Sequence, residues 1–94
     1  MELHPAARAE FDEAADRYEA DRPGLGPAFI AEVRRTADRA AAAPLTGSPY
    51  GRQVRRMLVR RFPYALVSAV EAERVFVVAV AHHRRRPRYW ARRL

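Results

Sequence analysis

The 94-residue sequence contains no cysteine and no lysine, only four glycines, and no long apolar run. The absence of cysteine excludes disulfides, thiolate nucleophiles and cysteine-ligated zinc. The apolar runs are far shorter than the roughly 20 residues that span a membrane. The first residues also lack the basic start and apolar core of a signal peptide. We therefore expect a cytoplasmic protein with no membrane span, no metal ion and no cofactor.

The residues that are present indicate a folded protein, since 49% are hydrophobic and 31% are charged. This composition is typical of globular chains and not of disordered ones. The length suits a single domain, residues 1–94, whose small core leaves room for a partner to add stability.

The charge is unevenly distributed along the chain. All 18 basic residues are arginine, and the formal net charge is +7. Residues 1–50 hold six arginines against nine acidic residues, a balance of −3, whereas residues 51–94 hold twelve against two, a balance of +10. The second half is therefore expected to attract a polyanion, either nucleic acid or an acidic protein. The alternative is a solvated surface that merely reflects a preference for arginine.

The first half predicts two helices. Residues 5–22 begin with Pro5, which suits the first helical position, and carry an apolar stripe at helical spacing. The stripe consists of Ala7, Phe11, Ala14, Ala15 and Tyr18. The segment 21–24 ends this helix because it contains Pro23 and Gly24, and a second apolar stripe predicts a helix over residues 26–42. The short link between them implies an antiparallel helical hairpin.

The second half changes to strand periodicity. Residues 44–51 read as a loop, 53–61 as a strand, Phe62–Pro63 as a turn and 64–70 as a second strand. A polar connection at 71–73 leads to a strand over 74–81, whose nearly continuous apolar character predicts a central strand covered on both faces. Residues 1–3 are a candidate for one more short strand. The predicted fold is α+β: an N-terminal antiparallel helical hairpin packed on a twisted antiparallel sheet of three to four strands.

Three segments in order carry a resemblance to a known family. They are LHPAARAEFDEAADRYEADRPGLGPAFIAEV, VRRMLVRRFPYALV and VFVVAVAHHRRRPRYW. With these segments the sequence resembles the RelE/ParE superfamily of type II toxin–antitoxin toxins, and within it the ParE-like branch. The resemblance implies the fold predicted above and a toxin neutralised by a cognate antitoxin in a hetero-oligomer.

The resemblance leaves two activities open. ParE-like members with an assigned target act on DNA gyrase, whereas RelE-like members cleave messenger RNA in the ribosome. Such cleavage needs a general base, a general acid and cations, and RelE-like toxins take part of this set from lysines. This sequence has no lysine, which argues against a nuclease. The candidates that remain for an mRNA endonuclease are Arg60, Arg61, His82, His83 and Tyr89.

The arginines are instead expected to bind a partner. The predicted partner-binding residues are Arg55, Arg56, Arg60, Arg61, Arg84, Arg85, Arg86 and Trp90. The alternative for Tyr89 and Trp90 is that they pack the tail onto the sheet, and Phe62 and Tyr64 are expected in or beside the core. A third possible function is a basic nucleic-acid-binding module.

Two further expectations concern surfaces. An extended antitoxin segment is expected to cover the edge of the sheet and the outer face of the hairpin, near Phe11, Tyr18, Phe29 and Val33. Ser68 and Ala69 are small where relatives carry larger residues. They are expected to leave a pocket or allow another chain to approach closely.

Overall fold

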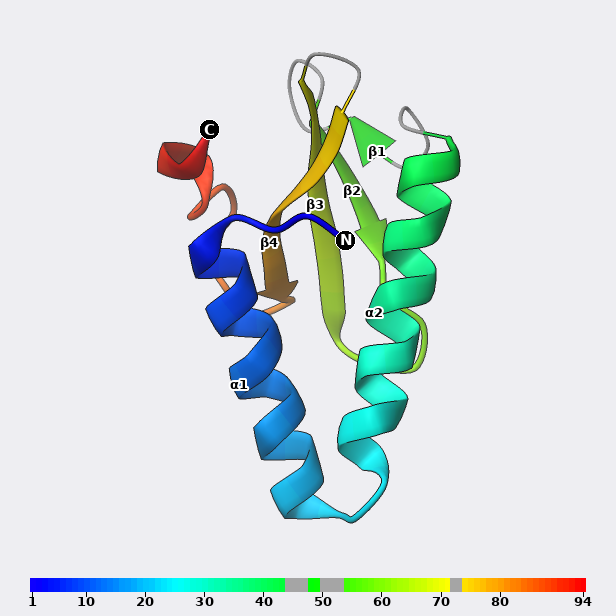
Figure 1. The fold of residues 1–94 in the computed structure, drawn as a ribbon. Helices are drawn as coiled ribbons and strands as arrows, with labels where there is room; N and C mark the ends of the chain where they lie inside the picture. The colour runs from blue at the N-terminus through cyan, green and yellow to red at the C-terminus, as the bar shows by residue number, and fades with distance from the viewer. Residues whose placement is uncertain (44–47, 50–53, 72–73) are drawn as a thin grey trace.

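A computed structural model describes residues 1–43, 48–49, 54–71 and 74–94 (Figure 1). Its elements, in chain order, are α1 (Pro5–Asp21), α2 (Leu25–Ala42), β1 (Ser48–Pro49), β2 (Val54–Leu58), β3 (Tyr64–Glu71), β4 (Arg74–His82) and the short 3-10 helix η1 (Ala91–Arg93). Both helices lie on one side of a single antiparallel sheet. The predicted α+β fold is therefore confirmed.

The helical hairpin depends on a tight connection between α1 and α2. Gly24 adopts a left-handed backbone with φ of 91° and caps α2 without a side chain. The Glu19 carboxylate replaces the missing cap, because its Oε1 accepts hydrogen bonds from the backbone N–H groups of Gly24 (2.9 Å) and Gly26 (3.0 Å). A negative charge there also suits the positive end of the helix dipole. Gly26 allows close approach, since an added Cβ would lie 2.9 Å from the carbonyl oxygen of Ala15.

The strands follow the order β1-β2-β3-β4, and each pair is antiparallel. Ser48–Pro49, predicted to be loop, instead pairs with Arg55 and Arg56 of β2. That prediction is wrong at these two residues because a residue before proline favours extended backbone, and proline is tolerated in an edge strand. Residues 44–47, 50–53 and 72–73, which include the rest of the predicted loops, lie outside the described part of the chain.

Strand β2 is shorter than predicted. It ends at Leu58, and residues 60–63 form the turn to β3. Arg61 takes a left-handed backbone in this turn, with φ of 72°. Arginines and apolar residues remain interleaved as far as Arg61 in the sequence, so the residue pattern alone did not detect the turn.

Strand β4 lies at the end of the sheet order, and β3 lies between β2 and β4. The prediction of a central β4 is therefore wrong, although two covered faces are found. The helices cover one face through the core that contains Leu66, Val77 and Val80, and the C-terminal tail covers the other through Trp90. An apolar run indicates that both faces of a strand are buried, but it does not indicate how many strands are hydrogen-bonded to that strand.

A β-bulge in β4 determines which of its side chains face each of the two cores. Val67 pairs with Ala79 but the next residue, Ser68, pairs with Val77, so Val78 is the extra residue. The bulge reverses the alternation of side chains and allows Val77 and Val80 to face the same core. Val78 itself packs in the opposite core with Trp90.

The outer edge of β4 is closed by the N-terminal segment. Val77 donates a hydrogen bond from its N–H to the Glu2 carbonyl, and its own carbonyl accepts one from His4, each at 2.8 Å. Leu3 thereby forms a parallel bridge with Val77, as the expectation of a short strand at residues 1–3 suggested. An ion pair between Arg74 and Glu2 adds to this contact, so the edge presents fewer unpaired groups to another chain.

The aromatic residues of the hairpin and the β2–β3 turn form the larger core. Phe62 and Tyr64 are buried there, as predicted, and their rings contact Phe29 at centroid distances of 5.2 and 5.0 Å. Phe11, Phe29 and Val33 are also buried. The expectation that these residues offer an outer face to a partner is wrong, because the hairpin turns its apolar stripe toward the sheet.

Candidate functional site

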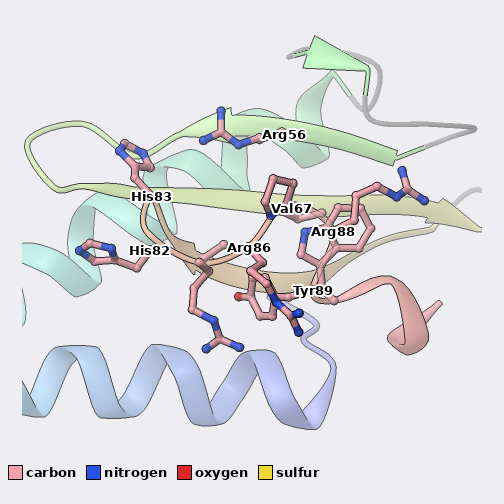
Figure 2. Close-up of a pocket in the computed structure, with 11 residues that line it drawn as sticks. Arg56, Val67, His82, His83, Arg86, Arg88 and Tyr89 are labelled. Carbon is pink, nitrogen blue, oxygen red and sulfur yellow. The ribbon is translucent and has the colours of Figure 1, made fainter.

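The chain leaves β4 at His82, turns and crosses the face of the sheet opposite the helices. The turn and the sheet together enclose a hollow of about 350 Å³ (Figure 2). It is lined by Arg56, Val67, Ala81, His82, His83, Arg85, Arg86, Pro87, Arg88, Tyr89 and Trp90. No carboxylate is among these described lining residues, so the hollow is cationic.

The positive side chains reach the hollow from two parts of the chain. Arg56 comes from β2, whereas Arg86 and Arg88 come from the tail, and Figure 2 shows them on different sides of the opening. Two aromatic rings support neighbouring guanidinium groups. Arg85 stacks over the ring of Tyr89 at 3.9 Å, and Arg88 lies 5.5 Å from the ring centroid of Trp90. The stacking on Tyr89 orients the Arg85 guanidinium while its N–H edge remains available to an anion.

The tail has an unusual backbone at Arg88, whose φ is 59°. Few residues other than glycine take this left-handed conformation, which is usually maintained by surrounding contacts. Here the flanking residues provide them, because Trp90 is only 2% exposed and the Tyr89 hydroxyl is hydrogen-bonded. The strained residue is therefore part of the wall of the hollow.

A clasp formed by Glu10, Tyr89 and Arg93 fixes the tail. Arg93 donates two hydrogen bonds to the Glu10 carboxylate, at 2.9 and 3.0 Å, and Tyr89 donates one at 2.7 Å. Glu10 also accepts from the N–H of Val80, and Arg93 donates to the carbonyl of Val78 at the bulge. The clasp thus joins α1, β4 and the tail, and it satisfies backbone groups at the outer edge of β4.

The clasp shifts the ionisation of its members. Burial, followed by the hydrogen bond to Glu10, raises the pKa of the Tyr89 hydroxyl far above its usual range. The hydrogen bond to Glu10 likewise raises the pKa of Arg93. The Tyr89 hydroxyl is therefore harder to deprotonate than that of an ordinary tyrosine, and its proton is engaged with Glu10. It is poorly placed to act as the general acid of a nuclease.

His82 lies at the rim of the hollow, with its ring 5.1 Å from that of Tyr64. Burial, and then the nearby charge of Arg84, lower the pKa of the His82 imidazole. Its Nδ1 accepts a hydrogen bond from the Arg84 N–H at 3.0 Å. The neutral ring therefore carries its proton on Nε2 and can donate from that atom. His83 is exposed in the turn, where its N–H bonds the Pro63 carbonyl.

The structure brings together only some of the predicted nuclease residues. His82, His83 and Tyr89 line the hollow, but Arg60 and Arg61 lie in the β2–β3 turn and do not. Arg60 instead lines a separate hollow with the α2 residues Glu32, Arg35, Asp38 and Arg39.

The predicted partner-binding residues are likewise divided. Arg56, Arg85 and Arg86 line the hollow, whereas Arg55 and Arg84 do not. Trp90 also lines it, but Trp90 is buried in the core on the sheet face opposite the helices. Its position therefore agrees with the alternative interpretation, in which Trp90 packs the tail onto the sheet. Its binding role remains a prediction.

Ser68 and Ala69 are buried, at 2% and 7% exposure, and neither lines the hollow. Ala69 packs in the same core as Trp90. The space that the small Ala69 leaves on this face is thus used within the chain, and the hollow opens beside Val67 on the same face.

Three charged residues of the site were missed by sequence reasoning: Glu10, Arg88 and Arg93. Glu10 belongs to the polar side of a helix, and Arg93 is separated from it by 83 positions. The local spacing of polar and apolar residues gives no indication of an ion pair between positions so far apart. For Arg88, the preceding Pro87 was a usable signal of a turn.

The site and fold together define a class: a small two-layer α+β protein whose arginine-rich tail forms a cationic hollow. The family model described as the ParE toxin of the type II toxin–antitoxin system, parDE, matches residues 1–87. The chain belongs to this family of toxins, so the resemblance noted in the sequence is confirmed.

A solved structure described as the chromosomal ParDE TA system from P. aeruginosa has a similar fold. Its TM-score is 0.72 at 16% sequence identity, and the match covers 87% of this chain and 95% of the other. No curated protein matches the chain by sequence. None of the helices in the described residues is long and apolar enough to cross a membrane.

Proposed function

We propose that this ParE-family toxin is held inactive by a cognate antitoxin and inhibits DNA gyrase once it is released. The observation that carries the proposal is the family match, which extends over residues 1–87. The similar structure from P. aeruginosa is described as a toxin–antitoxin system, which supports a paired antitoxin for this chain. The gyrase target follows from the ParE-like branch that the sequence resembles.

The geometry gives little support to RNA cleavage, the alternative to gyrase inhibition. Cleavage needs an acid, a base and phosphate-binding cations around one phosphodiester. In this chain the Tyr89 hydroxyl is engaged with Glu10, and Arg61 lies outside the hollow. The exposed arginines of the tail instead form a surface suited to an acidic macromolecule.

The target is tested with the purified full-length chain in a gyrase supercoiling assay. We expect loss of supercoiling, with Arg85→Ala/Arg86→Ala reducing the inhibition and Arg34→Ala leaving it unchanged. Arg34 is an exposed arginine of α2, outside the hollow. If growth continues normally when the chain is expressed without its antitoxin, and supercoiling is unaffected, the proposal is wrong.

The antitoxin is tested separately, because its binding does not depend on the target. We expect the adjacent reading frame to encode a small acidic protein that co-purifies with this chain and restores growth. A neighbouring frame without such a protein, or one whose product neither binds nor restores growth, would contradict a paired antitoxin.

One observation favours the second candidate, a ribosome-dependent mRNA endonuclease. His82 and His83 both line the cationic hollow, so imidazoles, the commonest acid–base groups of enzymes, lie beside cations that can bind a phosphate. Primer extension on translating ribosomes distinguishes the two. Cleavage that is lost in His82→Ala would establish the endonuclease, whereas intact transcripts during growth arrest would eliminate it.

A further inference from the structure

The cationic hollow combines two kinds of lining. Its sides carry the arginines and histidines described above, while its apolar surface is provided by Val67, Ala81, Pro87 and the buried Trp90. A site that binds phosphate alone needs only the cationic side chains, and a groove that binds an apolar ligand needs only the apolar residues. A ligand that matches both kinds of lining carries an anionic group on a weakly polar body.

The available charge supports an anionic ligand. The guanidinium groups of Arg56 and Arg86 form no ion pair with any residue in the described part of the chain. Arg85 is held by stacking on Tyr89, which leaves its N–H edge for an acceptor. Guanidinium groups recognise phosphate oxygens through two parallel hydrogen bonds. The described lining thus offers guanidinium donors that no carboxylate of the lining compensates.

The size and the rigidity of the hollow indicate a small ligand unit. A volume of about 350 Å³ lies at the lower end of the range for ligand pockets, roughly 300–1,000 Å³. The Glu10 clasp holds the tail that forms one wall, and Arg88 keeps a left-handed backbone within it. A site that is already formed loses little conformational entropy when it binds.

We propose that this hollow binds a single nucleotide, with its phosphate between Arg56 and Arg86 and its base or sugar against Val67, Pro87 and Ala81. The nucleotide is either free or one unit of a single strand. Binding requires no bond to be made or broken, and it does not depend on gyrase being the target.

The probe for binding is already in the protein. Trp90 is the one tryptophan in the sequence, and it lines the hollow. The full-length chain is titrated at low salt with dTMP, with a (dT)10 oligonucleotide and with inorganic phosphate, and Trp90 fluorescence is recorded. We expect a saturable change with dTMP or (dT)10 and weaker binding of phosphate. Equal affinity per site for dTMP and (dT)10 identifies a free nucleotide, whereas tighter binding of (dT)10 identifies a strand.

Matched variants locate the site. Arg56→Ala and Arg86→Ala should each weaken binding about ten-fold, and Arg34→Ala, which removes the same charge from α2, by less than about two-fold. Amide chemical shifts should move at Ala81 and at residues 86–90. Equal losses in all three variants would indicate general electrostatic attraction and overturn the proposal. So would saturable binding of a glutamate-rich peptide with no response to either nucleotide, or no response to any probe by a folded chain.

Discussion

At the scale of single residues, Glu10 makes the contacts on which the site depends. Its side chain is 16% exposed, and its carboxylate accepts hydrogen bonds from Arg93, Tyr89 and the backbone of Val80. A buried ion pair gains little net stability over an apolar pair, but the loss of one partner leaves the other charge uncompensated. The importance of Glu10 is therefore seen most clearly when it alone is replaced.

We predict that Glu10→Gln lowers the free energy of unfolding by about 1–3 kcal/mol, because Arg93 then keeps a buried charge without a counter-ion. Urea denaturation measures this change. The control is Asp12→Asn, which removes a carboxylate paired with Arg8 at the exposed surface and should change stability by less than about 0.5 kcal/mol. Equal effects of the two substitutions would show that the clasp adds no stability.

The raised pKa of Tyr89 predicts that the free energy of unfolding decreases at alkaline pH. Its pKa is raised in the folded chain, so the folded state retains the phenolic proton at a pH where the unfolded state has lost it. The stabilisation is complete below about pH 10, the ordinary pKa of tyrosine, and is lost as the pH rises above it. Unfolding experiments from pH 8 to 11.5 should show a steeper loss of stability in the wild type than in Tyr89→Phe. Parallel curves would contradict the prediction.

At the scale of elements, the helical hairpin depends on one close contact. Gly26 at the start of α2 packs against α1, and an added Cβ would lie 2.9 Å from both the Ala15 carbonyl and the Glu19 Cβ. The Glu19 carboxylate that caps α2 occupies the same region. The approach of the two helices and the capping of the second are therefore coupled.

We predict that Gly26→Ala destabilises the chain by about 1–3 kcal/mol, because the helices must separate or Glu19 must release α2. The matched control is Gly24→Asn, at a left-handed position with open space around it, which asparagine tolerates. Its effect should stay below about 1 kcal/mol in thermal or urea unfolding. A Gly26→Ala variant as stable as the wild type would show that the hairpin adjusts freely.

At the scale of the whole molecule, the sheet separates two cores. The helices close one, and a tail of only a few residues closes the other with Trp90 as its largest buried side chain. The tail also forms the hollow, so the folding of the second core and the shape of the site depend on the same segment. The shape of the hollow and the stability of the chain are thus linked through the tail.

We predict that Trp90→Ala lowers the free energy of unfolding by about 3–5 kcal/mol, a large part of the total for a small domain. Circular dichroism during heating measures the loss. Leu94→Ala, at a residue 59% exposed, is the control and should have little effect. A small effect of Trp90→Ala would mean that the tail is not needed to close the second core.

The sequence by itself determined the helical hairpin, the strands β2 to β4 and the concentration of positive charge in the second half. These features depend on local periodicity, turn residues and composition, which neighbouring positions reveal. Only the tertiary structure decided that β4 lies at the sheet edge, that Glu10 meets Arg93 across 83 positions, and that Arg56 joins the tail arginines around one hollow. Such contacts arise from chain topology and a single-residue bulge, and no period in the sequence specifies which distant side chains they bring together.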